Sequence, residues 1–117
     1  RADDAGVKVT VRTVGANGAT PTGQVVKGQP IVVTGYNLYY APDFEDAVEV
    51  SWTADGETKT AKLAPTAAGA ASMTFDWPEA LADVAAGTEL VFRFKLHGGV
   101  KDGPAQVCVK RAILVAE

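Results

Sequence analysis

The chain has 117 residues, with 11 Lys and Arg against 14 Asp and Glu, which gives a formal net charge of −3 at pH 7. That length suits one domain with its own core, so we expect a single domain over residues 1–117, with residues 1–6 as a flexible N-terminal segment. The acidic balance argues against an electrostatic grip on nucleic acid or on an anionic membrane, since both need clustered cations. The single Cys excludes a disulfide within the chain and a thiolate metal cluster.

An apolar period of two recurs along the chain, and this period is typical of strands that bury one face. It predicts strands at residues 7–12, 30–35, 48–53, 59–63, 72–77, 90–97 and 107–115. In the last of these the alternation breaks at residues 111–114, which suggests a bulge or a stretch buried on both faces. No run approaches the roughly 18 apolar residues of a membrane helix, so we expect no membrane partner.

Turn signals separate these strands. Asp55-Gly56 predicts a hairpin between the third and fourth strands. Pro78 to Ala86 predicts one short helical turn, with Leu81 and Val84 on a shared face. The Ala-rich residues 64–71 read as an exposed connection. About seven short antiparallel strands with turns at this spacing predict an all-β sandwich.

The inward rows of these strands predict the core, with Trp52 and Phe92 at its centre. Cys108 is expected to be a small core or near-core residue, and the alternative is a reactive thiol or an intermolecular disulfide. The full predicted core is Val9, Val11, Ile31, Val33, Leu38, Val50, Trp52, Leu63, Met73, Phe75, Leu81, Leu90, Phe92, Phe94, Val107, Val109 and Ile113.

Two segments carry a family resemblance. Residues 28–38, GQPIVVTGYNL, resemble the strand, Gly bend and buried Leu of bacterial immunoglobulin-like domains of the IPT/TIG type. They are similar also to the immunoglobulin-like module appended to HU-related DNA-binding proteins of gut bacteria. Residues 87–92, GTELVF, resemble the entry to the penultimate strand of such domains. The resemblance covers roughly residues 25 to 116 and implies an immunoglobulin-like β-sandwich.

The same resemblance implies a non-enzymatic structural or interaction module of a larger bacterial protein, such as the C-terminal accessory domain of an HU-like DNA-binding protein. Its partner would be another protein or a covalently linked neighbouring domain. The DNA contacts of such a protein belong to the HU-like half, so we expect no direct nucleic-acid contact here.

A Tyr-rich segment, residues 36–44, is the richest local signal for binding. It holds all three Tyr of the chain, and Tyr combines an apolar face with a polar tip. One interpretation is that Leu38 and one or two aromatic residues only close the end of the sandwich. The alternative function is a carbohydrate- or ligand-binding module, whose candidate binding residues are Tyr36, Tyr39, Tyr40, Asp43 and Phe44.

The sequence gives little support for a metal site or for catalysis. Asp43, Glu45 and Asp46 could be Ca²⁺ ligands, but they lack a Gly-centred loop, and we interpret them as a solvated acidic turn without metal. His97 is expected on a surface loop, and the two Ser residues, Ser51 and Ser72, are not in Gly-rich elbows. We therefore predict no enzyme activity and no cofactor.

Scattered cations allow a mild basic stripe, but the acids opposite them argue against duplex binding. They are Lys8, Arg12, Arg93, Lys95, Lys101, Lys110 and Arg111.

Overall fold

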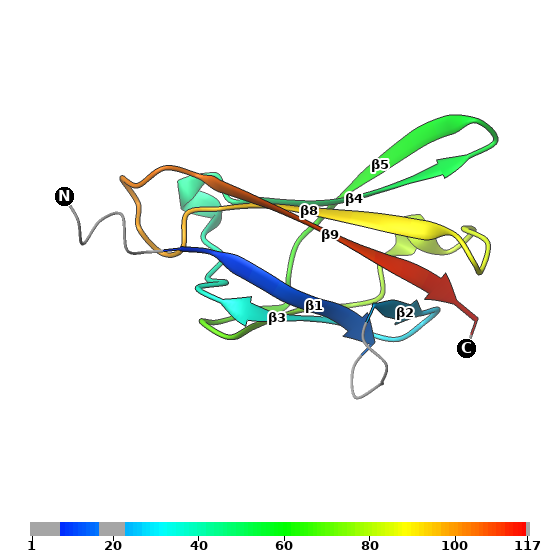
Figure 1. The fold of residues 1–117 in the computed structure, drawn as a ribbon, viewed down its shortest axis with the longest axis horizontal. Helices are drawn as coiled ribbons and strands as arrows, with labels where there is room; N and C mark the ends of the chain where they lie inside the picture. The colour runs from blue at the N-terminus through cyan, green and yellow to red at the C-terminus, as the bar shows by residue number, and fades with distance from the viewer. Residues whose placement is uncertain (1–7, 17–22, 117) are drawn as a thin grey trace.

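The computed structural model describes residues 8–16 and 23–116, which form two β-sheets packed face to face (Figure 1). The four-stranded sheet has the order β1-β3-β7-β6, with β1 (Thr10–Ala16), β3 (Ile31–Tyr36), β7 (Ser72–Phe75) and β6 (Ala67–Ala68). The five-stranded sheet has the order β2-β9-β8-β4-β5, with β2 (Gln24–Val26), β9 (Gln106–Val115), β8 (Glu89–Leu96), β4 (Ala47–Ala54) and β5 (Glu57–Leu63). Two single-turn 3₁₀ helices, η1 (Pro42–Phe44) and η2 (Glu79–Leu81), are the helical elements of the described residues.

The strand order is that of an immunoglobulin sandwich. Lettered in that scheme, β1, β3, β7 and β6 form the sheet A-B-E-D, and β4, β8 and β9 form C-F-G. Strand β5 extends the second sheet beside β4, and β2 pairs with β9 in parallel, whereas the other pairings of the described residues are antiparallel. The predicted fold class is therefore confirmed.

The core lies between the two sheets and is built from alternate residues of each strand, because successive side chains of a strand point to opposite faces. Most of the predicted core is confirmed as buried: Val9, Val11, Ile31, Val33, Leu38, Val50, Trp52, Leu63, Met73, Phe75, Leu81, Leu90, Phe92 and Phe94. Cys108 is half-buried and packs against this core, as expected, and its Sγ lies 3.5 Å from the carbonyl oxygen of Val9.

Three predicted core residues are wrong, and all three are on β9. Val107, Val109 and Ile113 are 49%, 52% and 39% exposed. The inward row is instead Cys108, Lys110, Ala112 and Leu114. Across the pairing with β8, Phe94 lies opposite Cys108 and Leu90 opposite Ala112, so the large side chains of β8 face small neighbours on β9. This size match holds for Cys108 and Ala112 alone, because the same inward row includes Leu114 and Lys110, which lies opposite Phe92.

Residues 111–114 contain neither a bulge nor a stretch buried on both faces, the two alternatives that we predicted there. Strand β9 pairs with β8 in unbroken register from Gln106 to Ile113, and Arg111 and Ile113 are exposed. A register shift occurs instead in β1, between Val11 and Thr13, where Arg12 is the extra residue. A bulge changes which residues face inward. Accordingly Val9 and Val11 are buried before it and Val14 after it.

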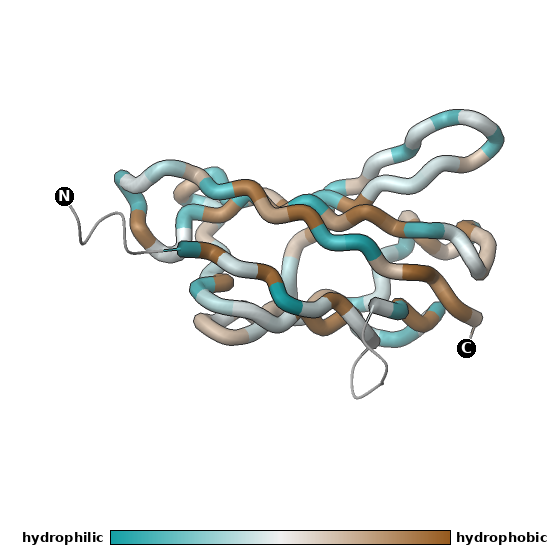
Figure 2. The backbone as a smooth tube through the Cα atoms, in the orientation of Figure 1, coloured by the Kyte–Doolittle hydropathy of each residue, from teal (hydrophilic) through white to brown (hydrophobic). Residues whose placement is uncertain are grey.

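The Asp55-Gly56 hairpin is confirmed, and it projects beyond the rest of its sheet (Figure 1). Asp55 and Gly56 have φ values of 53° and 78°, as a type I′ turn requires. Strand β4 pairs with β8 only as far as Ser51, whereas it pairs with β5 as far as Ala54. The projecting part is largely hydrophilic (Figure 2). Trp52 therefore lies buried at the base of the hairpin and not at the centre of the core.

The remaining expectations have mixed outcomes. The helical turn predicted at residues 78–86 is present as η2, with Leu81 and Val84 both buried. The Ala-rich connection is exposed but contributes the short strand β6. The expectation for residues 1–6 lies outside the described residues. No helix among the described residues is both long enough and apolar enough to cross a lipid bilayer.

Candidate functional site

The Tyr-rich segment connects β3 to β4 at one end of the sandwich. Tyr36 is the last residue of β3, and Asn37 follows with φ of 60°, which turns the chain sharply. The Asn37 side-chain amide donates a hydrogen bond to the carbonyl oxygen of Lys8 at 2.7 Å. Leu38 is fully buried, and its N–H donates to the carbonyl oxygen of Ala70 at 3.1 Å. The start of this loop is therefore held by core packing and by hydrogen bonds to two distant segments.

A buried carboxylate holds the other end of the loop. Asp46 is the only charged residue that is buried among the described residues. Its Oδ2 accepts a hydrogen bond from the N–H of Ala41 at 2.8 Å, which closes the loop around η1. Its Oδ1 accepts from the backbone N–H of His97 at 3.0 Å and lies 2.6 Å from His97 Nδ1. The carboxylate thus joins the loop to the end of β8, and both of its oxygens have partners, as a buried charge requires.

His97 is not the surface-loop residue that we predicted from the sequence. Its side chain is mostly buried against Asp46, and its ring meets the ring of Phe44 edge-on, with centroids 6.3 Å apart. The neighbouring Gly98 and Gly99 have positive φ values, so the chain turns away directly after the histidine. This arrangement makes His97 a link between β8 and the Tyr-rich loop.

The five predicted binding residues separate into two groups. Tyr36 and Tyr39 are 56% and 43% exposed, and Asp43 is exposed on η1. Tyr40 packs against the core and Phe44 is half-buried beside His97, so these two support the loop. A cation–π contact places the Arg12 guanidinium 5.8 Å from the Tyr36 ring centre. Tyr36, Tyr39 and Asp43 remain the candidates for contact with a ligand.

The acidic turn is only partly solvated. Asp43 and Glu45 are exposed, as predicted, but Asp46 is buried and its oxygens accept the hydrogen bonds described above. Within the described residues no three His, Cys, Asp or Glu side chains form a group that could hold a metal ion.

A second candidate surface is the solvent-facing side of the sheet formed by β9, β8, β4 and β5, which we call the outer face. Val107, Val109 and Ile113 lie on it, as does Arg111 between them. Strand β8 contributes Val91, Arg93 and Lys95, which pair with Arg111, Val109 and Val107. Aliphatic and cationic side chains are therefore interleaved on adjacent strands.

The charges of the outer face are predominantly positive, although the whole chain is acidic. Arg93 lies 3.8 Å from Glu49, and Arg111 lies 3.6 Å from Glu89. Lys95 and Lys62 add two cations, and Lys62 pairs with Glu49 across β4 and β5. The described strands of the outer face thus carry four cations and two carboxylates. Exposed ion pairs of this kind are weak, so the cations remain available to an outside partner.

The sequence does not show which side of β9 faces solvent, because both rows of side chains on this strand contain aliphatic residues and one cation. Val107, Val109 and Ile113 share their row with Arg111, and Cys108, Ala112 and Leu114 share theirs with Lys110. The one usable signal is the size of Leu90 and Phe94, which lie opposite Ala112 and Cys108, and it depends on knowing the register. The Asp46–His97 contact spans 51 positions of the chain and had no local signal.

Comparison with known proteins concerns the fold alone. No protein-family model matches the sequence, and no curated protein matches it. The fold is similar to that of a "Putative bacterial DNA binding protein" from Bacteroides vulgatus, with a TM-score of 0.58 and 16% sequence identity. The match covers 92% of this chain and 47% of that chain, so this chain spans about half the length of the protein it resembles.

Proposed function

We propose that this domain is a non-enzymatic interaction module of a larger bacterial protein, and that its outer face contacts a partner protein or a neighbouring domain. The observation that supports this proposal most strongly is the aliphatic row Val107, Val109 and Ile113 on the solvent side of β9. Single exposed apolar residues are common, but three of them on one face of the same strand favour a contact surface.

Packing within the domain does not require aliphatic side chains on the solvent side of β9. The core side of β9 is supplied by Cys108, Ala112 and Leu114. Burial of the outward aliphatic groups against a partner would contribute about 25 cal/mol for each Å² removed from water. The surrounding Arg93, Lys95 and Arg111 favour a partner with an acidic surface, because complementary charge steers association and fixes orientation.

The likeness to part of a longer chain supports the idea of a module within a larger protein. The family resemblance of the sequence implies the accessory domain of an HU-like DNA-binding protein, and we propose that role as the more specific function. In that arrangement the HU-like half contacts DNA, and this domain contacts protein.

Site-specific photo-crosslinking in the full-length protein, in its own cells, tests this function. A benzophenone amino acid replaces Val109 on the outer face or, as a control, the exposed Ser72 on the other sheet. We expect a discrete product from position 109, mapped by mass spectrometry to an acidic surface of one partner or of the rest of the chain. The same products from both positions, or none from position 109, would contradict the proposal.

A second candidate function, carbohydrate or small-ligand binding, is favoured by the exposure of Tyr36 and Tyr39 on a loop fixed at both ends. Rigid aromatic faces suit stacking on sugar rings. A glycan array identifies a ligand, and an NMR titration with that glycan should then shift the amides of residues 36–44, with loss of binding in Tyr39→Ala. An array without hits would eliminate this candidate.

A further inference from the structure

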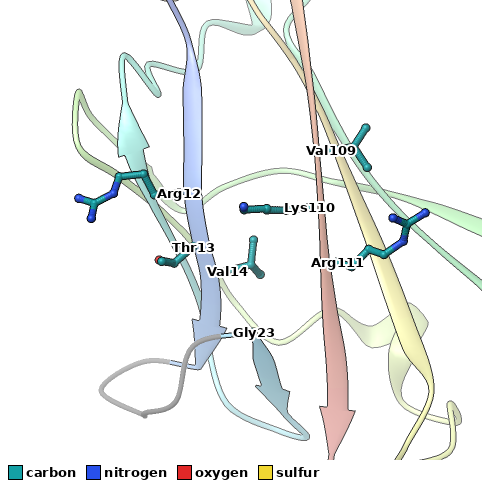
Figure 3. Close-up of a pocket in the computed structure, with 7 residues that line it drawn as sticks. All are labelled: Arg12, Thr13, Val14, Gly23, Val109, Lys110 and Arg111. Atoms are coloured by element: carbon teal, nitrogen blue, oxygen red, sulfur yellow. The ribbon is translucent and has the colours of Figure 1, made fainter.

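A groove lies between β1 and β9, on the side of the sandwich where the two sheets part (Figure 3). It has a volume of about 400 Å³ and is lined by residues 12–14 of β1, by Gly23 and by residues 109–111 of β9. It shares Val109 and Arg111 with the outer face, but it opens beside the edge of β9, toward β1.

Lys110 is the charged group inside this groove. It occupies the inward row of β9, and its side chain extends from β9 toward β1 (Figure 3). The two arginines at the rim point away from the groove, since Arg12 lies over Tyr36 and Arg111 beside Glu89. No carboxylate of the described residues forms an ion pair with Lys110. Lys110 is therefore a half-buried residue that lacks an anionic partner in the described part of the chain.

Among the described residues no strand pairs with the edge of β9 beside Lys110, and the backbone of Val9 contacts only the side chains of Gln106 and Cys108 near the start of β9. Strand β2 pairs with β9 only at residues 113–115, and the N–H of Ile113 donates to the carbonyl oxygen of Gly23. Backbone groups alternate in direction along a strand, so those of Val107, Val109 and Arg111 face the same side as Ile113. No described backbone group bonds to these three residues on that side. They present a row of donors and acceptors that another strand can pair with.

We propose that this groove is a strand-addition site that takes an extended peptide segment carrying an Asp or Glu opposite Lys110. The segment pairs with the open edge of β9 above β2, and its carboxylate neutralises the ammonium group. A bound peptide without an acidic residue would bury the Lys110 ammonium group without an anionic partner, which costs free energy. A second copy of β9 would bring its own lysine, so Lys110 selects an acidic peptide against self-association.

The test uses the 117-residue chain and two synthetic peptides, acetyl-TVTDTVT-amide and the same peptide with Asn in place of Asp. Titrations are followed by amide NMR shifts and by hydrogen exchange. We expect the Asp peptide to shift and protect the amides of Val107, Val109 and Arg111, and to bind about tenfold more tightly than the Asn peptide.

Lys110→Gln should abolish the difference between the two peptides, and its free spectrum shows whether the fold is retained. The matched control Lys59→Gln, at an exposed position of β5 outside both surfaces, should preserve the difference. Equal affinities of both peptides for the unmodified chain, shifts away from β9, an equal effect of the two lysine variants, or no saturable binding would each overturn the proposal. These outcomes depend on Lys110 and on the acid of the peptide, neither of which the photo-crosslinking test varies.

Discussion

Gly35 lies where β3 passes closest to β1, opposite Val11 at the start of the bulge. A Cβ atom at this position would clash with the carbonyl oxygen of Thr10, and the clash could be relieved only by movement of the backbone. The glycine is thus required by the close approach of two strands. The sequence resemblance had pointed to this residue as the bend before the buried leucine, but the contact with Thr10 depends on the bulge and had no local signal.

Gly35→Ala should destabilise the domain by about 2–3 kcal/mol, because the methyl group forces β1 and β3 apart. Gly69→Ala is the matched control, since a Cβ there meets nothing within 4 Å, and its effect should stay within about 0.5 kcal/mol. Urea unfolding of both variants measures the two values. Equal stability of the two variants would show that the approach of Thr10 is not as close as described.

At the scale of elements, Asp46 connects the Tyr-rich loop to β8. Three groups, the N–H of Ala41, the N–H of His97 and the His97 ring nitrogen, converge on one buried carboxylate. This connection fixes the loop that presents Tyr36 and Tyr39. It also explains why a single histidine at the end of a strand is buried and not solvated.

Asp46→Ala should lower the free energy of unfolding by about 3 kcal/mol, since it leaves buried donors without an acceptor. Asp43→Ala, three residues earlier and exposed, should change it by less than about 0.5 kcal/mol. Thermal unfolding compares the two, and NMR spectra should show movement of residues 37–46 in Asp46→Ala alone. If both variants melt alike, the carboxylate does not hold the loop.

Elements with one clearly polar row were predictable from the sequence. In β8 the apolar residues Leu90, Phe92 and Phe94 alternate with a row that is charged except at Val91, and the hairpin after β4 has its Asp-Gly turn. Strand β9 could not be oriented, because each of its rows contains aliphatic residues and one cation. Strands as short as β2 and β6 carry too few residues for a period to be seen.

At the scale of the molecule, charge is unevenly distributed. The chain has a net charge of −3, yet the outer face carries more cations than carboxylates. Two of those cations, Arg93 and Arg111, lie near carboxylates. The cations also lie among aliphatic side chains, so they do not form a continuous positive stripe. This distribution suits an acidic protein surface better than the regular phosphate array of DNA.

The isolated chain should therefore bind duplex DNA no more tightly than about 10⁻⁴ M at low salt. Fluorescence anisotropy with a labelled 20-base-pair duplex is the measurement. A micromolar affinity that weakens steeply with salt, and that is lost in Lys95→Glu, would instead assign the outer face to nucleic acid.

The orientation of β9 underlies both proposed surfaces, and one pair of variants tests it most directly. Val109→Thr keeps a β-branched side chain at an exposed position, so the free energy of unfolding should change by less than about 0.5 kcal/mol. Leu114→Ala empties a fully buried position and should cost about 2–5 kcal/mol. Chemical denaturation gives both values. A large loss for Val109→Thr with a small one for Leu114→Ala would mean that β9 faces the other way, and the outer face would not exist.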